Sequence, residues 1–90
     1  MPTISRFFGI MIRMYWKDHN KPHFHATYSG QKAVYQISPL KKMVKGTSKR
    51  FSPRANRLVL QWANEHLSEL LVNWELVSQH LPGNEVEGLR

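Results

Sequence analysis

The sequence predicts a single α+β domain over residues 1–90, in which a small antiparallel sheet of three to four N-terminal strands packs against one long or two shorter C-terminal helices. Ninety residues are enough for one domain and for nothing larger. Apolar side chains alternate with period two over residues 1–46 and recur at three-and-four spacing over residues 52–81. We therefore expect a sheet followed by helix, with residues 84–90 as a loose tail or an edge strand.

The first strand is predicted from Ile10 to Trp16, where apolar and polar side chains alternate. Its apolar face consists of Ile10, Ile12, Met14 and Trp16. Arg13 and Tyr15 lie on the opposite face. Pro22 then ends the pattern, because proline lacks the backbone donor that a central strand needs. The region reads as a half-buried strand followed by a turn.

Two further strands are predicted on either side of a Ser29-Gly30 hairpin turn, one from His23 to Tyr28 and one from Gln31 to Ile37. The earlier strand places Phe24 and Ala26 on one face and both of its histidines on the other. The later strand buries Ala33, Tyr35 and Ile37 or the alternate set. A short fourth strand is expected from Leu40 to Val44.

The helical part is predicted to begin after Ser52, a suitable N-cap, with Pro53 at the first helical position, where its missing N–H costs nothing. One apolar stripe follows, made of Ala55, Leu58, Val59, Trp62, Ala63, His66, Leu67, Leu70, Leu71, Trp74 and Val77. No glycine or proline interrupts it before Pro82. We expect one long helix, or two joined near His66, with the tryptophans as core anchors.

Composition excludes several classes of protein. The chain has no cysteine, which rules out disulfides, thiolate metal sites and cysteine nucleophiles. Its longest hydrophobic stretch, Phe7 to Met14, is interrupted and too short for a spanning helix or a signal peptide. We therefore expect a cytoplasmic protein with no membrane contact. A domain this small buries a limited share of its surface, which favours a homodimer or a partner chain.

Charge is unevenly placed along the chain. Residues 1–57 carry a net charge of +11 and residues 58–90 carry −4, which together give the net charge of +7. This distribution predicts a basic surface for a polyanion, backed by an acidic helix layer. The alternative is an ordinary solvated surface with a high isoelectric point.

Three of the five histidines lie within seven positions around the turn between the first two predicted strands. They are His19, His23 and His25. The last two project to the same side of a strand. If the turn folds His19 back, three imidazoles with an open fourth position suit a divalent metal such as zinc. Plain surface histidines, or histidines hydrogen-bonded within the turn, are the alternative.

The same histidines also suit metal-free chemistry on RNA. Cleavage by the 2′-hydroxyl of RNA needs a base, an acid and cations around the phosphate, and histidine takes either proton role near neutral pH. The candidate catalytic residues are His23, His25 and Arg13. The neighbouring cations that suit a phosphate are Lys17, Lys21 and Lys32. Tyr15, Tyr28 and Tyr35 suit base stacking where they are exposed, and a core position is the commoner role of each.

A second basic cluster leads into the predicted helix. It consists of Lys41, Lys42, Lys45, Lys49, Arg50, Arg54 and Arg57. Such a cluster is typical of contacts with a phosphate backbone that do not read sequence. A solvated loop and helix face is the alternative.

Several of these segments resemble one family. The opening Met1-Pro2-Thr3-Ile4-Ser5-Arg6-Phe7-Phe8-Gly9-Ile10, the loop Asp18-His19-Asn20-Lys21-Pro22-His23-Phe24-His25-Ala26 and the helical elements Arg57-Leu58-Val59-Leu60-Gln61-Trp62-Ala63 and Asn73-Trp74-Glu75-Leu76 are similar to the small bacterial family called domain of unknown function forty-one sixty. The resemblance implies a small protein partner encoded nearby, in an arrangement like a toxin–antitoxin pair.

Together these observations lead to one expected function and two alternatives. We expect a component of a toxin–antitoxin-like pair that engages nucleic acid, namely RNA, through a basic sheet surface, with ribonuclease-type or metal-dependent hydrolytic activity left open. The first alternative is a histidine-based metal-binding module or metalloenzyme. The second is a protein-interaction module whose histidines are structural.

Overall fold

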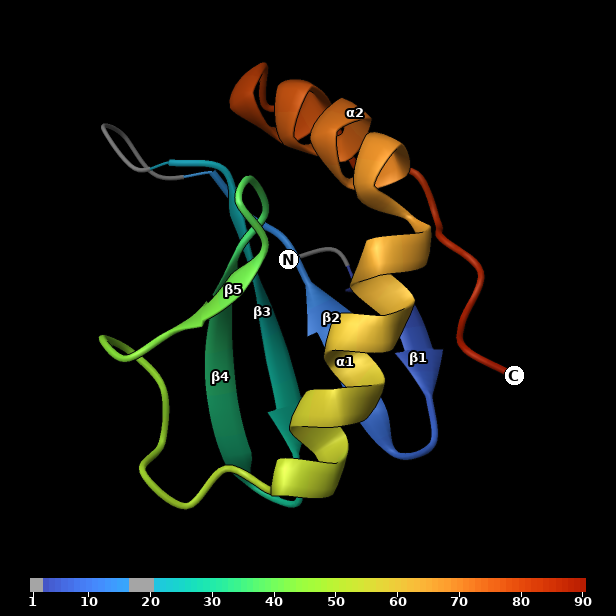
Figure 1. Ribbon diagram of the computed structural model, residues 1–90. Coiled ribbons are helices and arrows are strands. Elements are labelled where there is room, and N and C mark those ends of the chain that lie inside the picture. The colour runs from blue at the N-terminus through green and yellow to red at the C-terminus, as the bar shows by residue number, and fades with distance from the viewer. Residues whose placement is uncertain (1–2, 17–20) are drawn as a thin grey trace.

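The computed structural model describes residues 3–16 and 21–90 and contains an antiparallel sheet followed by two helices (Figure 1). The strands pair in sequence order and are β1 (Thr3–Phe7), β2 (Ile10–Arg13), β3 (His23–Tyr28), β4 (Gln31–Gln36) and β5 (Lys41–Met43). The helices are α1 (Pro53–Glu65) and α2 (Leu67–Ser78). The α+β class and the element order are confirmed. The prediction of three to four strands is wrong, because the sheet has five.

The additional strand is β1, in which buried and exposed residues do not alternate regularly. A register shift between Thr3 and Ser5 leaves both Ile4 and Ser5 buried, so two neighbouring residues share the interior. The turn to β2 uses Phe8 and Gly9, both with positive φ, as a two-residue hairpin loop of this kind requires. Phenylalanine is uncommon in such a turn, so residues 8–9 carry no hairpin signal that sequence patterns would reveal.

The alternation of the central strands is as predicted. Phe24 and Ala26 on β3 are fully buried, and the buried residues of the next strand are Ala33 and Tyr35 rather than the alternate set. The expected strand from Ile10 to Trp16 is shorter, because pairing stops at Arg13. Trp16 is therefore 36% exposed and was wrongly assigned to the buried face.

Helix α1 lies across one face of the sheet, and α2 crosses the end of the sheet (Figure 1). Ser52 is the N-cap, and its Oγ accepts a hydrogen bond of 3.1 Å from the Ala55 backbone nitrogen. The chain leaves the helical conformation at His66, with φ −129°, and resumes it at Leu67. The two-helix alternative is therefore correct. Trp62 is fully buried in the core between α1 and the sheet.

Residues 84–90 lie beside β1 (Figure 1). The Val86 backbone nitrogen donates to Ile4 O at 2.7 Å, and the Val86 side chain is buried. Trp62 Nε1 donates to Glu87 O at 2.8 Å, which joins this segment to the core. A Cβ added at Gly88 would lie 2.6 Å from Arg6 O, so only glycine fits. The segment thus covers the outer edge of the sheet. Within the described ranges, no helix has the length and apolar character needed to cross a membrane.

Candidate functional site

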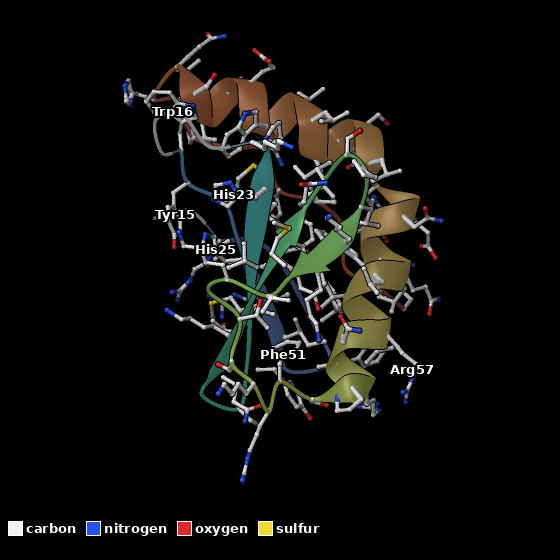
Figure 2. All side chains as sticks on the ribbon, turned by 60° about the vertical axis from the view of Figure 1, so that its left-hand side comes forward. Tyr15, Trp16, His23, His25, Phe51 and Arg57 are labelled. Carbon is white, nitrogen blue, oxygen red and sulfur yellow. The ribbon has the colours of Figure 1, made fainter. Side chains whose placement is uncertain are left out.

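The candidate histidines lie on the side of the sheet that faces away from α1 (Figure 2). Cross-strand partners in a sheet project to the same side, and His25 is paired with Arg13 on β2 and with Val34 on β4. We use "outer face" for this side. Its polar and charged members that bear on function are Arg13, His23, His25, Lys32 and Lys41, placed there by register.

Three aromatic rings form a cluster on the outer face. Tyr15 stacks on His25 with ring centroids 4.4 Å apart and an angle of 16° between the planes. The Tyr15 hydroxyl lies 3.3 Å from His25 Nδ1. The rings of His23 and His25 are 5.3 Å apart, as expected for two histidines on the same side of one strand. His23 also contacts Trp74 of α2 at 5.1 Å, so this helix borders the cluster.

The environment of His25 keeps its ring neutral. Burial lowers the pKa of His25 from 6.5 to about 4, and the nearby charges of His23 and Lys32 lower it in the same direction. At pH 7 the ring can accept a proton but has no second proton to donate as a general acid. Its Nε2 atom is also shielded from solvent and lacks a hydrogen-bond partner among the described residues.

His23 is held differently. Its Nδ1 atom lies 2.8 Å from Lys21 O, and because a carbonyl only accepts, Nδ1 carries the proton in this contact. In a neutral ring the other nitrogen, Nε2, is then a hydrogen-bond acceptor. The two neighbouring histidines are therefore unequal: Nδ1 of His23 is fixed by the backbone, whereas His25 is fixed by stacking.

A second unpartnered nitrogen lies across the strand from His25. Among the described residues, Arg13 Nε is buried and has no hydrogen-bond partner. An unpaired buried donor costs about 1–3 kcal/mol, so an acceptor that reached Arg13 would recover part of that cost. This pair of cross-strand neighbours, Arg13 and His25, is where the outer face has unused hydrogen-bonding capacity.

Further cations lie at the β5 side of the sheet. Residues 44–50, which we call the strap, run from β5 back along β4, where the Val34 backbone nitrogen donates to Thr47 Oγ1 at 2.9 Å. Gly46 has φ +86° and passes so close to Val34 that an added Cβ would lie 3.0 Å from its side chain. The exposed cations of β5 and the strap are Lys41, Lys42, Lys45, Lys49 and Arg50.

The remaining predicted phosphate-binding cations lie away from β5 and the strap. Arg54 and Arg57 are exposed on α1, and Arg57 points away from the sheet (Figure 2). The structure therefore does not bring them together with the outer face. Lys21 is exposed just before β3. Lys17 and His19 lie outside the described residues.

Acidic side chains are absent from the described part of the sheet and strap. In residues 3–16 and 21–50 the ionisable carboxylates number zero, whereas all five glutamates lie on the helices or in the C-terminal segment. They are Glu65, Glu69, Glu75, Glu85 and Glu87. The described residues of the sheet and strap thus carry cations and no carboxylate, whereas the helices and the C-terminal segment together carry a net negative charge.

The two chemistries predicted for the histidines, proton transfer and metal binding, place different requirements on the structure. A proton-transfer pair needs open ring nitrogens, and in this conformation His25 Nε2 is enclosed. A metal site needs a third ligand, and the described residues contain no group of three or more His, Cys, Asp or Glu side chains that could hold an ion. The proposed third ligand, His19, lies outside the described residues, so the metal site stays a prediction.

Sequence reasoning missed two parts of this surface. Tyr15, which follows the end of β2, stacks on His25 of β3, and only the three-dimensional arrangement of the two segments reveals this contact. The strap is bound to β4 by hydrogen bonds from the backbone of β4 to Thr47 and Ser48, and no sequence pattern indicates these bonds. A threonine-serine pair beside a glycine was the available signal, but many loops contain one.

Comparison with known proteins gives one match. The family model described as a domain of unknown function (DUF4160) matches residues 9–75, which include β2 to β5, α1 and most of α2. Neither a curated protein nor a solved structure matches the chain.

Proposed function

The chain belongs to the DUF4160 family of domains of unknown function, and from that starting point we propose that it binds RNA through the outer face and the strap, as one component of a toxin–antitoxin-like pair. The observation that carries the proposal is the separation of charge between the two layers. The described residues of the sheet and strap carry cations and no carboxylate, while the glutamates lie on the opposite layer. Such a surface attracts a polyanion and orients it.

The hydrogen-bonding capacity of the outer face supports a phosphate ligand in particular. Arg13 is partly exposed, and although its Nε is shielded and has no partner among the described residues, a phosphate oxygen is a strong acceptor for the guanidinium group as a whole. His25 stays neutral and stacked, so it contributes shape and a ring edge rather than charge. Around this centre, Lys32 and Lys41 extend the positive surface over β4 and β5.

The proposal is tested by RNA affinity at several salt concentrations. Binding should weaken as salt rises, with a slope of about 0.7 per phosphate neutralised on a single strand. Changing Lys41, Lys42, Lys45 and Lys49 together to Glu should weaken binding and flatten that slope. Absence of binding at low salt, or an unaltered slope in the variant, would contradict the proposal.

The toxin–antitoxin part of the proposal has its own test. If this chain is the toxic member of the pair, expressing it alone should slow bacterial growth. His23→Ala combined with His25→Ala should relieve the effect while the protein remains folded, as judged by circular dichroism. Harmless expression of the unaltered chain would exclude the toxic role and leave only the RNA-binding part.

A further inference from the structure

A groove lies beside the outer face, between the end of β2 and the C-terminal end of α2. It has a volume of about 390 Å³. Its lining includes the buried side chains Met14 and Val77 and the exposed side chains Trp16, His80 and Leu81. None of the residues that line it is acidic. The groove is therefore an apolar recess with an aromatic wall, and none of its described lining residues would repel a polyanion.

Trp16 stands apart from the other tryptophans of the chain. It is 36% exposed, whereas Trp62 and Trp74 are 0% and 7% exposed. The imidazole of His80 meets it at 5.8 Å and 89°, so this neighbour does not stack on the indole face. An indole that neither joins the core nor has a stacked partner among the described residues offers a surface for another planar ring.

The groove is continuous with the outer face through Tyr15. This side chain lines the groove and also stacks on His25 at the centre of the outer face. Arg13, with its unpartnered Nε, lies two positions before Tyr15 on the same segment of chain. An RNA strand whose phosphates occupied the outer face would therefore pass the mouth of the groove.

We infer that the groove receives one unpaired base of a single-stranded RNA, stacked against Trp16, while the phosphates lie on the outer face. This inference rests on the proposed RNA binding and adds to it a site for a base. Bases stack on aromatic side chains whatever their sequence, so the site selects single-stranded over duplex RNA rather than one base over another. The adjoining cationic surface favours this occupant over an apolar side chain of a protein.

The test compares two probes of equal length and charge: a short oligouridylate and the same ribose-phosphate chain without bases. The unaltered protein should bind the oligouridylate about 5- to 150-fold more tightly, as expected for one stacked base. Trp16→Leu should abolish this preference and leave affinity for the abasic probe unchanged. Trp16→Phe, which keeps an aromatic ring, should retain most of it.

Phe8→Leu is the matched control, because Phe8 is an exposed aromatic residue in the β1–β2 turn and does not line the groove. It should leave the preference intact. Tryptophan fluorescence is a second readout, and it uses the unaltered protein, so that no substitution affects folding. Oligouridylate should quench this fluorescence, because Trp16 is exposed. Trp16→Phe should remove that quenching.

The outcomes separate this inference from the proposed function. Salt-dependent binding of both probes with equal affinity would overturn the base site and leave RNA binding in place. Loss of binding to both probes in the unaltered protein would contradict both the base site and the proposed RNA binding. If Trp16→Leu leaves the preference unchanged, or if it alters only a complex with a protein partner, the groove is not a base site.

Discussion

The two faces of the sheet are built from the same strands, yet they differ in almost every physical property. The face under α1 is covered by apolar side chains, with Phe24 and Ala26 fully buried. The outer face carries the alternate residues of the same strands, including His25 with its lowered pKa and Arg13 with an unpartnered Nε. One face therefore stabilises the domain, and the other keeps polar groups available. The difference shows that period-two alternation divides core-facing residues from outer-face residues within each strand.

The largest expected contrast concerns two tryptophans in different regions. Trp62→Ala should lower the free energy of unfolding by about 3–5 kcal/mol, because it empties a fully buried site and removes the hydrogen bond to Glu87 O. Trp16→Ala should cost less than half as much, because its side chain is partly in water. Urea unfolding of both variants measures the difference. Equal losses would mean that Trp16 belongs to the core.

A pH titration tests the environment of His25. Its folded pKa of about 4 lies below the ordinary value of 6.5, so the unfolded chain binds a proton that the folded chain does not. Stability should therefore be complete above pH 6.5 and fall as the pH decreases toward 4, by about 1–2 kcal/mol for a partly exposed ring. His25→Gln should remove this component of the decrease. A variant with the same pH profile as the unaltered protein would show that His25 is not responsible.

The smallest contrast concerns two tyrosine hydroxyls. The buried Tyr35 hydroxyl donates to Asn56 Oδ1 at 2.7 Å, and burial raises the pKa of Tyr35. Tyr35→Phe should cost about 1 kcal/mol, since it leaves a partly buried acceptor unpaired. Tyr15→Phe on the outer face should cost less, because its hydroxyl makes only a 3.3 Å contact with His25. Thermal unfolding of the two variants measures both losses of stability. A larger loss for Tyr15→Phe than for Tyr35→Phe would show that the outer face is the more tightly packed one.

Much of this division was visible in the sequence, because it depends on local pattern. The opposite projection of Phe24 and His25 and the cap at Ser52 follow from side-chain type and spacing. The apolar stripe left one long helix and two helices joined near His66 as alternatives, and only the structure decides between them. What escaped prediction depends on contacts between distant segments. The bulge at Ser5 disguised β1, and the end of pairing at Arg13 released Trp16 from the sheet.

The candidate site shows the same limit. The sequence predicted that His23 and His25 share a side, and their rings are 5.3 Å apart. It grouped Arg57 with the cations of β5, although α1 carries Arg57 away from the sheet. It also offered no reason to join Trp16 with His80, which are separated along the chain by β3, β4, β5 and both helices. Which cations share a surface is a property of the fold.

The central claim is that RNA binds the outer face and not α1, and two double variants with the same change in charge test it most directly. Lys32→Glu with Lys41→Glu alters the outer face, and Arg54→Glu with Arg57→Glu alters α1. With RNA affinity measured at several salt concentrations, the outer-face pair should weaken binding strongly and reduce the salt slope by about 1.4, which corresponds to two phosphate contacts. The α1 pair should leave the slope unchanged. Equal losses in the two variants, or a larger loss in the α1 pair, would contradict the account.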